Sequence, residues 1–106
     1  MTKVFITTSF PAFHCWPGAP DECSFLRNKH RHVFHVRMEK EVFHSDRDIE
    51  FITFKKEVDR YINEVWANSD MQNESCEMLA KTFMEIFKCV RVEVSEDGEN
   101  GAIVEI

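Results

Sequence analysis

Residues 32–43 alternate between apolar and polar side chains, and this period of two predicts a β-strand. Every second residue from His32 to Met38 shares one face of that strand, while the opposite face is polar and charged. Residues 3–13 are rich in β-branched and aromatic types and predict an earlier strand. Between the two, residues 14–31 contain two prolines and one glycine, so we expect a long loop.

Two later stretches have an apolar residue every three or four positions, which is the period of an amphipathic helix. The first predicted helix covers residues 54–65, with Thr53 as its N-cap. The apolar positions of the second run from Leu79 to Val90, and Ser75 is its predicted N-cap. Glu77 lies in the first turn of this second helix, where the helix dipole favours a carboxylate.

The C-terminal segment predicts a β-hairpin. Valines alternate with polar residues over 90–95, the turn sequence DGENG occupies residues 97–101, and a last strand covers residues 102–106. The resulting order is strand, strand, helix, helix, strand, strand. It predicts one α+β domain over residues 1–106, a four-stranded antiparallel sheet with two helices on one face. The other face must then be exposed to solvent or covered in an oligomer.

The composition narrows the classes of function. A formal net charge of −6 argues against nucleic acid as a partner, because binding phosphates requires a concentrated basic face. No apolar run approaches the length of a membrane span and the N-terminus lacks the features of a secretory signal, so we expect a cytoplasmic location. The chain has four cysteines without a CxxC pair, and we expect free thiols.

Four of the five histidines lie between residues 14 and 35, and three of them suggest a metal site. His30 and His32 project from the same face of a strand, and His14 ends the preceding strand, where an antiparallel return of the chain brings it beside them. Three neutral imidazoles around zinc leave a fourth position open, as in catalytic zinc sites. An H-x-H pair also arises by chance on surface strands, so spacing alone leaves both interpretations open.

Five short segments resemble the 6-pyruvoyl- and 6-carboxy-tetrahydropterin synthase family, in the family's order and across nearly the whole chain. FPAFH (10–14) is similar to F-x-A-x-H, and HRHVF (30–34) is similar to H-G-H-x-Y. DIEFITFK (48–55) is similar to V-x-D-F-x-x-L-K, and SCEMLA (75–80) is similar to T-x-E-N-L-A. VEVSE (92–96) is similar to V-x-V-x-E. The resemblance implies the T-fold of this family. It also implies assembly as a trimer, or as a hexamer of paired trimers, with the strands of several subunits joined into a barrel.

The same resemblance implies roles for particular side chains. His14, His30 and His32 would bind Zn²⁺. Glu96 would anchor the amide and amidine edge of a pterin- or guanine-like ring, because one carboxylate can accept two parallel N–H bonds. Glu77 is implied as a second ligand-binding carboxylate.

The chain departs from the family at its proton-transfer residues. Leu26 stands where the family has its reactive cysteine, so Cys23 is the favoured substitute, with Cys15 as another candidate and an idle thiol as the alternative. The family's Asp-His pair between the helices is reduced to Asp70, because Met71 follows it. General acid–base chemistry needs a group that titrates near neutrality, and methionine does not.

Two main functions follow from these residues. The first is a zinc-dependent lyase-type enzyme acting on a reduced pterin such as 7,8-dihydroneopterin triphosphate, in pterin or deazaguanine biosynthesis. Four basic residues could meet a triphosphate: Arg27, Lys29, Arg31 and Arg37. The second is a non-catalytic oligomeric protein that binds a purine- or pterin-like molecule. A zinc-stabilised oligomer with a vestigial pocket is a third, blander interpretation.

Overall fold

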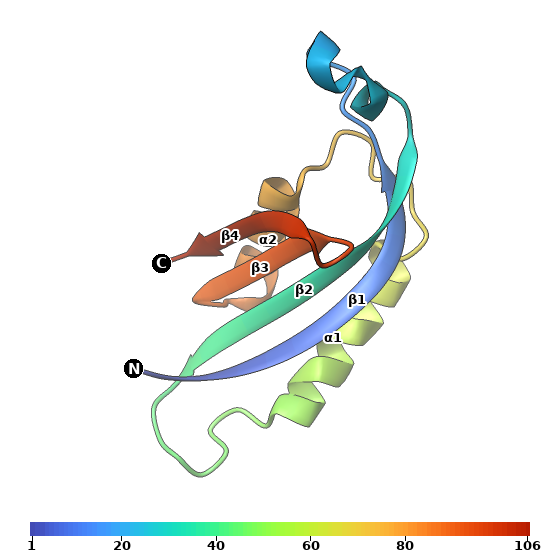
Figure 1. Ribbon diagram of the computed structural model, residues 1–106. Helices are drawn as coiled ribbons and strands as arrows, with labels where there is room; N and C mark the ends of the chain where they lie inside the picture. The colour runs from blue at the N-terminus through green and yellow to red at the C-terminus, as the bar shows by residue number, and fades with distance from the viewer.

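Two long strands form half of the sheet in the computed structural model, which describes residues 1–106 (Figure 1). β1 (Thr2–His14) and β2 (His30–Val42) are antiparallel, and the pairing runs from Thr2 opposite Val42 to His14 opposite His30. Because the pairing with β1 extends to His30, β2 begins two residues before the predicted position. The predicted loop over 14–31 is correspondingly shorter, and a 3-10 helical segment, η1 (Asp21–Arg27), occupies its centre.

The hairpin of β3 (Arg91–Glu96) and β4 (Asn100–Glu105) completes an open sheet with the strand order β1-β2-β3-β4. Its turn contains Asp97 and Gly98 at φ values of 56° and 74°. Type I′ hairpin turns require positive φ at two successive residues, which Asp-Gly adopts readily. The predicted hairpin is therefore confirmed, with β4 beginning two residues earlier than expected.

The first helix, α1 (Phe51–Val65), begins earlier than the apolar pattern indicates. The N-cap is Glu50, and not Thr53 as predicted. The Glu50 carboxylate accepts hydrogen bonds from the backbone N–H groups of Ile52 and Thr53, at 2.8 and 3.1 Å. The longer side chain of glutamate reaches these groups, and the observed cap lies three residues before the predicted one.

The second helix, α2 (Cys76–Phe87), has the predicted N-cap, because the Ser75 hydroxyl accepts a hydrogen bond from the Met78 backbone at 3.1 Å. Lys88 adopts the left-handed conformation and ends the helix. The helical period predicted through Val90 therefore runs three residues too far. None of the helices combines the length and the apolar character needed to cross a lipid bilayer.

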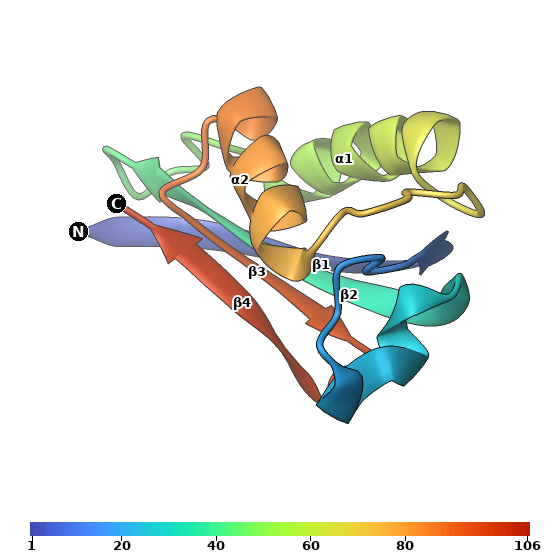
Figure 2. The ribbon, with the colours of Figure 1, turned by 90° about the horizontal axis from the view of Figure 1, so that it is seen from above.

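Both long helices cover one face of the sheet, and the core lies between them and the strands (Figure 2). The prediction that Phe34, Val36 and Met38 share a buried face is confirmed, since each is at most 2% exposed. The same face continues past the apolar core into His32 and His30 on β2. The candidate metal ligands therefore lie at one end of the core.

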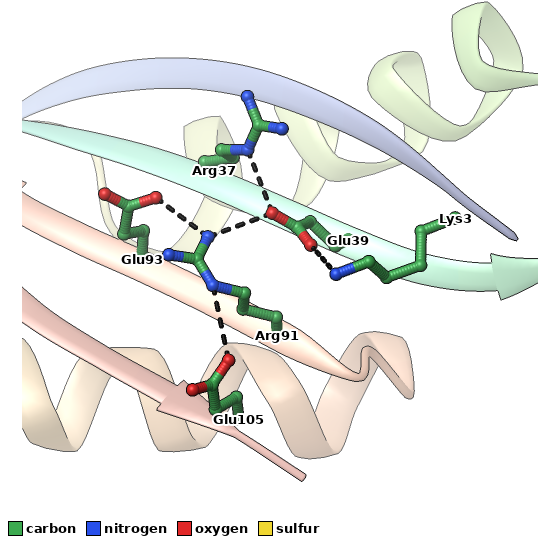
Figure 3. A network of polar contacts seen from close by, with 6 residues as sticks. All are labelled: Lys3, Arg37, Glu39, Arg91, Glu93 and Glu105. Carbon is green, nitrogen blue, oxygen red and sulfur yellow. Dashed lines mark hydrogen bonds and ion pairs between the residues drawn. The ribbon is translucent and has the colours of Figure 1, made fainter. Parts of the chain in front are cut away.

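The opposite face of the sheet has no helix on it and is crossed by a network of charged side chains (Figure 3). Glu39 is at its centre, with ion pairs to Lys3 at 2.6 Å, Arg91 at 2.9 Å and Arg37 at 3.0 Å. These partners leave Glu39 only 6% exposed. The hydrogen bond from Lys3, followed by those from Arg37 and Arg91, lowers the pKa of Glu39 to about 2 against the cost of burial.

Candidate metal centre

Three histidines from the two long strands meet at one end of the core. His14 is the last residue of β1 and faces His30, the first residue of β2, while His32 follows on the same face. The ring centroids of His14 and His30 are 4.6 Å apart, those of His30 and His32 are 5.0 Å apart, and those of His14 and His32 are 5.4 Å apart. One ring nitrogen from each residue lies within 4.8 Å of the other two. The predicted triad is therefore assembled and could hold a metal ion.

Each imidazole directs its Nδ1 atom at an oxygen. His14 faces the backbone carbonyl of Glu74 at 2.7 Å, and His30 faces that of Asn28 at 2.8 Å. The third ring, His32, faces the carboxylate of Asp97 at 2.7 Å. Because these oxygens accept and do not donate, Nδ1 carries the proton of each neutral ring and Nε2 keeps its lone pair. Metal-binding histidines are commonly oriented by such a bond on the other ring nitrogen.

The free nitrogens of this triad are the clearest sign of a ligand site. The Nε2 atoms of His14 and His30 are both buried and have no hydrogen-bond partner. Leaving a buried polar atom without a partner costs about 1–3 kcal/mol. Three neutral imidazole donors suit zinc. The residues present therefore fit a zinc ion bound through Nε2 atoms.

Glu96 lies beside the triad. It is the last residue of β3 and pairs with Phe34 of β2, so its side chain points to the same face as His32. Its carboxylate oxygens are 3.4 Å from Nε2 of His14 and 3.2 Å from Nε2 of His32. The structure thus places this predicted ligand-binding carboxylate within reach of any ion or ligand that the histidines bind.

Asp97 is the functional residue that sequence reasoning missed, because it was assigned only to the turn. Its Oδ2 atom contacts His32 and its Oδ1 atom accepts a hydrogen bond from the Val33 backbone at 3.0 Å. The bond from Val33, then the bond from His32, lowers the pKa of Asp97 below its usual value. The residue is therefore ionised and orients the His32 ring. An Asp-Gly turn directly after Glu96 was the available signal, but its use required the register between β2 and β3.

A cavity of about 540 Å³ opens beside the histidines, within the size range of small-molecule sites. Its walls come from β1, β2, the connection between them with η1, the linker before α2, α2 itself and the β3–β4 hairpin. Three carboxylates contribute to it, those of Glu74, Glu77 and Glu96, and no lysine or arginine does. Burial raises the pKa of Glu74, one of whose carboxylate oxygens has no partner.

The two residues proposed for proton transfer lie elsewhere. Cys23 is part of η1 and does not contribute to the cavity wall. Asp70 also lies outside the wall, where it contacts Lys29 at 3.7 Å and accepts a hydrogen bond from the Gln72 backbone at 2.9 Å.

The thiols that do line the cavity are Cys15 and Cys76, and all four cysteines are free. Burial, helped by the charges of Glu96 and Glu77, raises the pKa of Cys76 to about 12. This thiol is therefore protonated at neutral pH and is a poor nucleophile. Cys15 is only half-buried and directly follows His14.

The basic residues considered for a triphosphate are also outside the cavity. Arg27 donates to the Ala19 carbonyl and to Asp21, and Arg37 belongs to the Glu39 network on the other face.

No protein-family model and no curated protein matches the chain.

Proposed function

We propose that this protein is a zinc-dependent protein of the 6-pyruvoyl- and 6-carboxy-tetrahydropterin synthase type, with a T-fold, that acts on a reduced pterin. The observation that supports this most directly is the meeting of His14, His30 and His32 within metal-binding distance of one another. Two of them, His14 and His30, line the cavity together with three carboxylates, and their buried Nε2 atoms have no hydrogen-bond partner. Bound zinc would supply a Lewis acid that polarises a carbonyl or acidifies a hydroxyl group.

In this proposal, the histidines bind the metal and the glutamates bind the heterocycle. His14, His30 and His32 hold the metal, and their Nδ1 bonds keep the rings from turning. Glu96 and Glu77 accept hydrogen bonds from the N–H groups along the edge of the heterocycle. Two parallel bonds to one carboxylate would select the amide and amidine edge of a pterin over rings that lack two adjacent donors.

Assembly with further copies of the chain is part of the proposal. The sheet is open, with β1 and β4 as its edge strands (Figure 1). The last residues of β1 are hydrogen-bonded to the linker before α2, but no strand of this chain pairs with the outer edges of β1 and β4. Phe5 and Ile103 are 51% and 52% exposed on the face that carries no helix. A trimer or hexamer whose strands join into a barrel would pair these edges and cover this face.

A binding protein without turnover is the second candidate, and the position of the proton-transfer residues favours it. Neither Cys23 nor Asp70 lines the cavity, and the Cys76 thiol has its pKa near 12. Turnover would therefore require another group on the cavity wall. The candidates are the Cys15 thiol and the Glu74 carboxyl, whose pKa is raised by burial.

The test begins with metal analysis of the protein purified without chelators. We expect about one zinc per chain in the wild type, and none in a variant with both His30→Ala and His32→Ala. His35→Ala is the matched control, because His35 is exposed on the opposite face of β2. Wild-type protein that contains no metal would refute the proposal.

Incubation of the zinc-loaded protein with 7,8-dihydroneopterin triphosphate then separates the two candidates. Conversion that the double variant lacks supports the enzyme. Saturable binding of the pterin without conversion supports the binding protein, and the absence of both removes pterins as ligands.

A further inference from the structure

The distances from the Glu96 carboxylate to His14 and His32 are close to those between two ligands of one metal ion. Tetrahedral zinc with nitrogen and oxygen ligands at about 2.0–2.1 Å has neighbouring ligand atoms about 3.3–3.4 Å apart. Oε1 of Glu96 is 3.4 Å from Nε2 of His14, and Oε2 of Glu96 is 3.2 Å from Nε2 of His32. The carboxylate therefore lies at this spacing from two of the three histidines.

The charges at this contact point the same way. With Nδ1 protonated on both rings, each Nε2 presents a lone pair to carboxylate oxygens, so acceptors face acceptors. The buried Nε2 of His14 has no hydrogen-bond partner, although Glu96 is close to it. A cation shared by these two nitrogens and the carboxylate would satisfy all of these groups.

The backbone of Glu96 is held in place for this role. β3 is paired on both sides, with Glu96 opposite Phe34 of β2 and opposite Asn100 of β4. The next residue, Asp97, binds the other ring nitrogen of His32. Two consecutive residues thus contact the two nitrogens of the His32 ring. The hairpin therefore fixes the position of the Glu96 carboxylate relative to this ring. The Glu96 side chain remains 25% exposed at the cavity, where a ligand can reach it.

We infer that Glu96 is the fourth protein ligand of the metal while the cavity holds no small molecule, and that an incoming ligand displaces this carboxylate from the metal. This inference rests on the proposed zinc site and adds a step to it. The carboxylate that completes the resting centre is then free to accept N–H bonds from the ligand that displaced it. Ligand entry and opening of the metal are therefore coupled through one side chain.

The experiment compares zinc affinity, by chelator competition, in the wild type, Glu96→Gln and Glu77→Gln, all without pterin. Glu77→Gln is the matched control, because it removes another carboxylate of the same cavity wall without a contact to the histidines. We expect Glu96→Gln to bind zinc at least about tenfold more weakly than the wild type, and Glu77→Gln to bind it equally well. Glu96→Asp, which keeps the charge but shortens the reach, should be intermediate, and it replaces the Gln variant if that variant fails to fold.

Cobalt(II) in place of zinc gives a second readout, because its visible absorption reports the number and type of ligands. The spectrum of Glu96→Gln should differ from that of the wild type. The wild-type spectrum should also change when a reduced pterin is added. Equal zinc affinity and an unchanged cobalt spectrum in Glu96→Gln would overturn this inference and leave the proposed function standing. Absence of zinc from the wild type would overturn both.

Discussion

Each histidine of the candidate metal centre uses one ring nitrogen to contact the protein, and its other nitrogen could bind a ligand. The oxygens that bind the Nδ1 atoms come from three separate segments: the end of the loop at Asn28, the linker at Glu74 and the hairpin turn at Asp97. Two of them are backbone carbonyls, which any residue type would supply. At the scale of single residues, the choice of tautomer therefore depends on chain positions that have no chemical signature in the sequence.

The Asp97 carboxylate is the one side chain among these acceptors, and its charge can be removed separately. Asp97→Asn keeps a residue type that tolerates the positive φ of 56° but loses the charge that favours the His32 Nδ1–H bond. We expect zinc affinity to fall by about tenfold, in the range typical of lost outer-shell partners. Chelator competition measures this, and Asp46→Asn, an exposed acid paired only with Arg47, should bind zinc like the wild type. Unchanged affinity in Asp97→Asn would show that the carbonyls suffice.

At the scale of elements, the β3–β4 hairpin contributes more to the site than its length suggests. Its first strand ends at Glu96, its turn holds Asp97, and Asn100 and Gly101 line the cavity at the start of its second strand. The hairpin is therefore both an edge of the sheet and one wall of the site. A change that loosens it should affect stability and metal binding together.

Gly101 offers that change. A Cβ atom at this position would lie 2.0 Å from the backbone oxygen of Val94, so β4 would have to move away from β3. We expect Gly101→Ala to lower the free energy of unfolding by about 1–3 kcal/mol or more, as overpacking does, and to weaken zinc binding. Denaturant titration measures the first effect. Gly18→Ala is the control, because its added Cβ would meet its nearest neighbour, Trp16, at an ordinary 3.7 Å. Equal stability of the two variants would contradict the close approach.

At the scale of the whole molecule, the sheet has one face covered by helices and one face crossed by charges. On the charged face, the Glu39 carboxylate forms ion pairs with three cations from three strands (Figure 3). Unlike the apolar core, this arrangement depends on pH.

The free energy of unfolding should therefore decrease in acid, because protonation of Glu39 removes its ion pairs. Its pKa is lowered from 4.5 to about 2 in the folded protein, so its contribution is complete above about pH 5 and is lost as the pH falls toward 2. We expect Glu39→Gln to be less stable than the wild type at pH 7 by about 1–2 kcal/mol. The difference should shrink between pH 5 and pH 2 in denaturant titrations. Glu41→Gln, on the same face and without an ion pair, should show no such trend, and a pH-independent difference for Glu39→Gln would contradict the assignment.

The proposed assembly makes a prediction at the same scale. Light scattering should give a mass of about three or six times the 12.5 kDa of the chain. Ile103→Lys places a charge on the exposed face of the edge strand β4 and should lower that mass. Lys56→Glu, a change on helix α1, is the control for charge alone. A wild-type mass of one chain would refute the barrel.

Much of the fold follows from patterns that act over a few residues. The period of two placed Phe34, Val36 and Met38 on the buried face, the helical period located α1 and α2, and Asp-Gly located the hairpin. The ends of elements were less predictable: Glu50 replaced Thr53 as a cap, because a long side chain can reach back to the same N–H groups.

The histidine triad was also predictable, because its members lie on two strands joined by one connection and a hairpin-like return brings them together. What surrounds the triad was not. The contacts of His14 with Glu74 and of His32 with Asp97 span 60 and 65 residues, and the cavity wall includes Cys15 and Cys76 in place of Cys23.

The sequence by itself thus determined which residues share a face, since this depends on local backbone geometry, and it named the three histidines that are candidates for binding a metal. Only the tertiary structure decided the tautomer of each histidine, the position of Glu96 and the groups on the cavity wall. These depend on the register between β2 and β3 and on how the linker packs against β1, and local periodicity does not encode either.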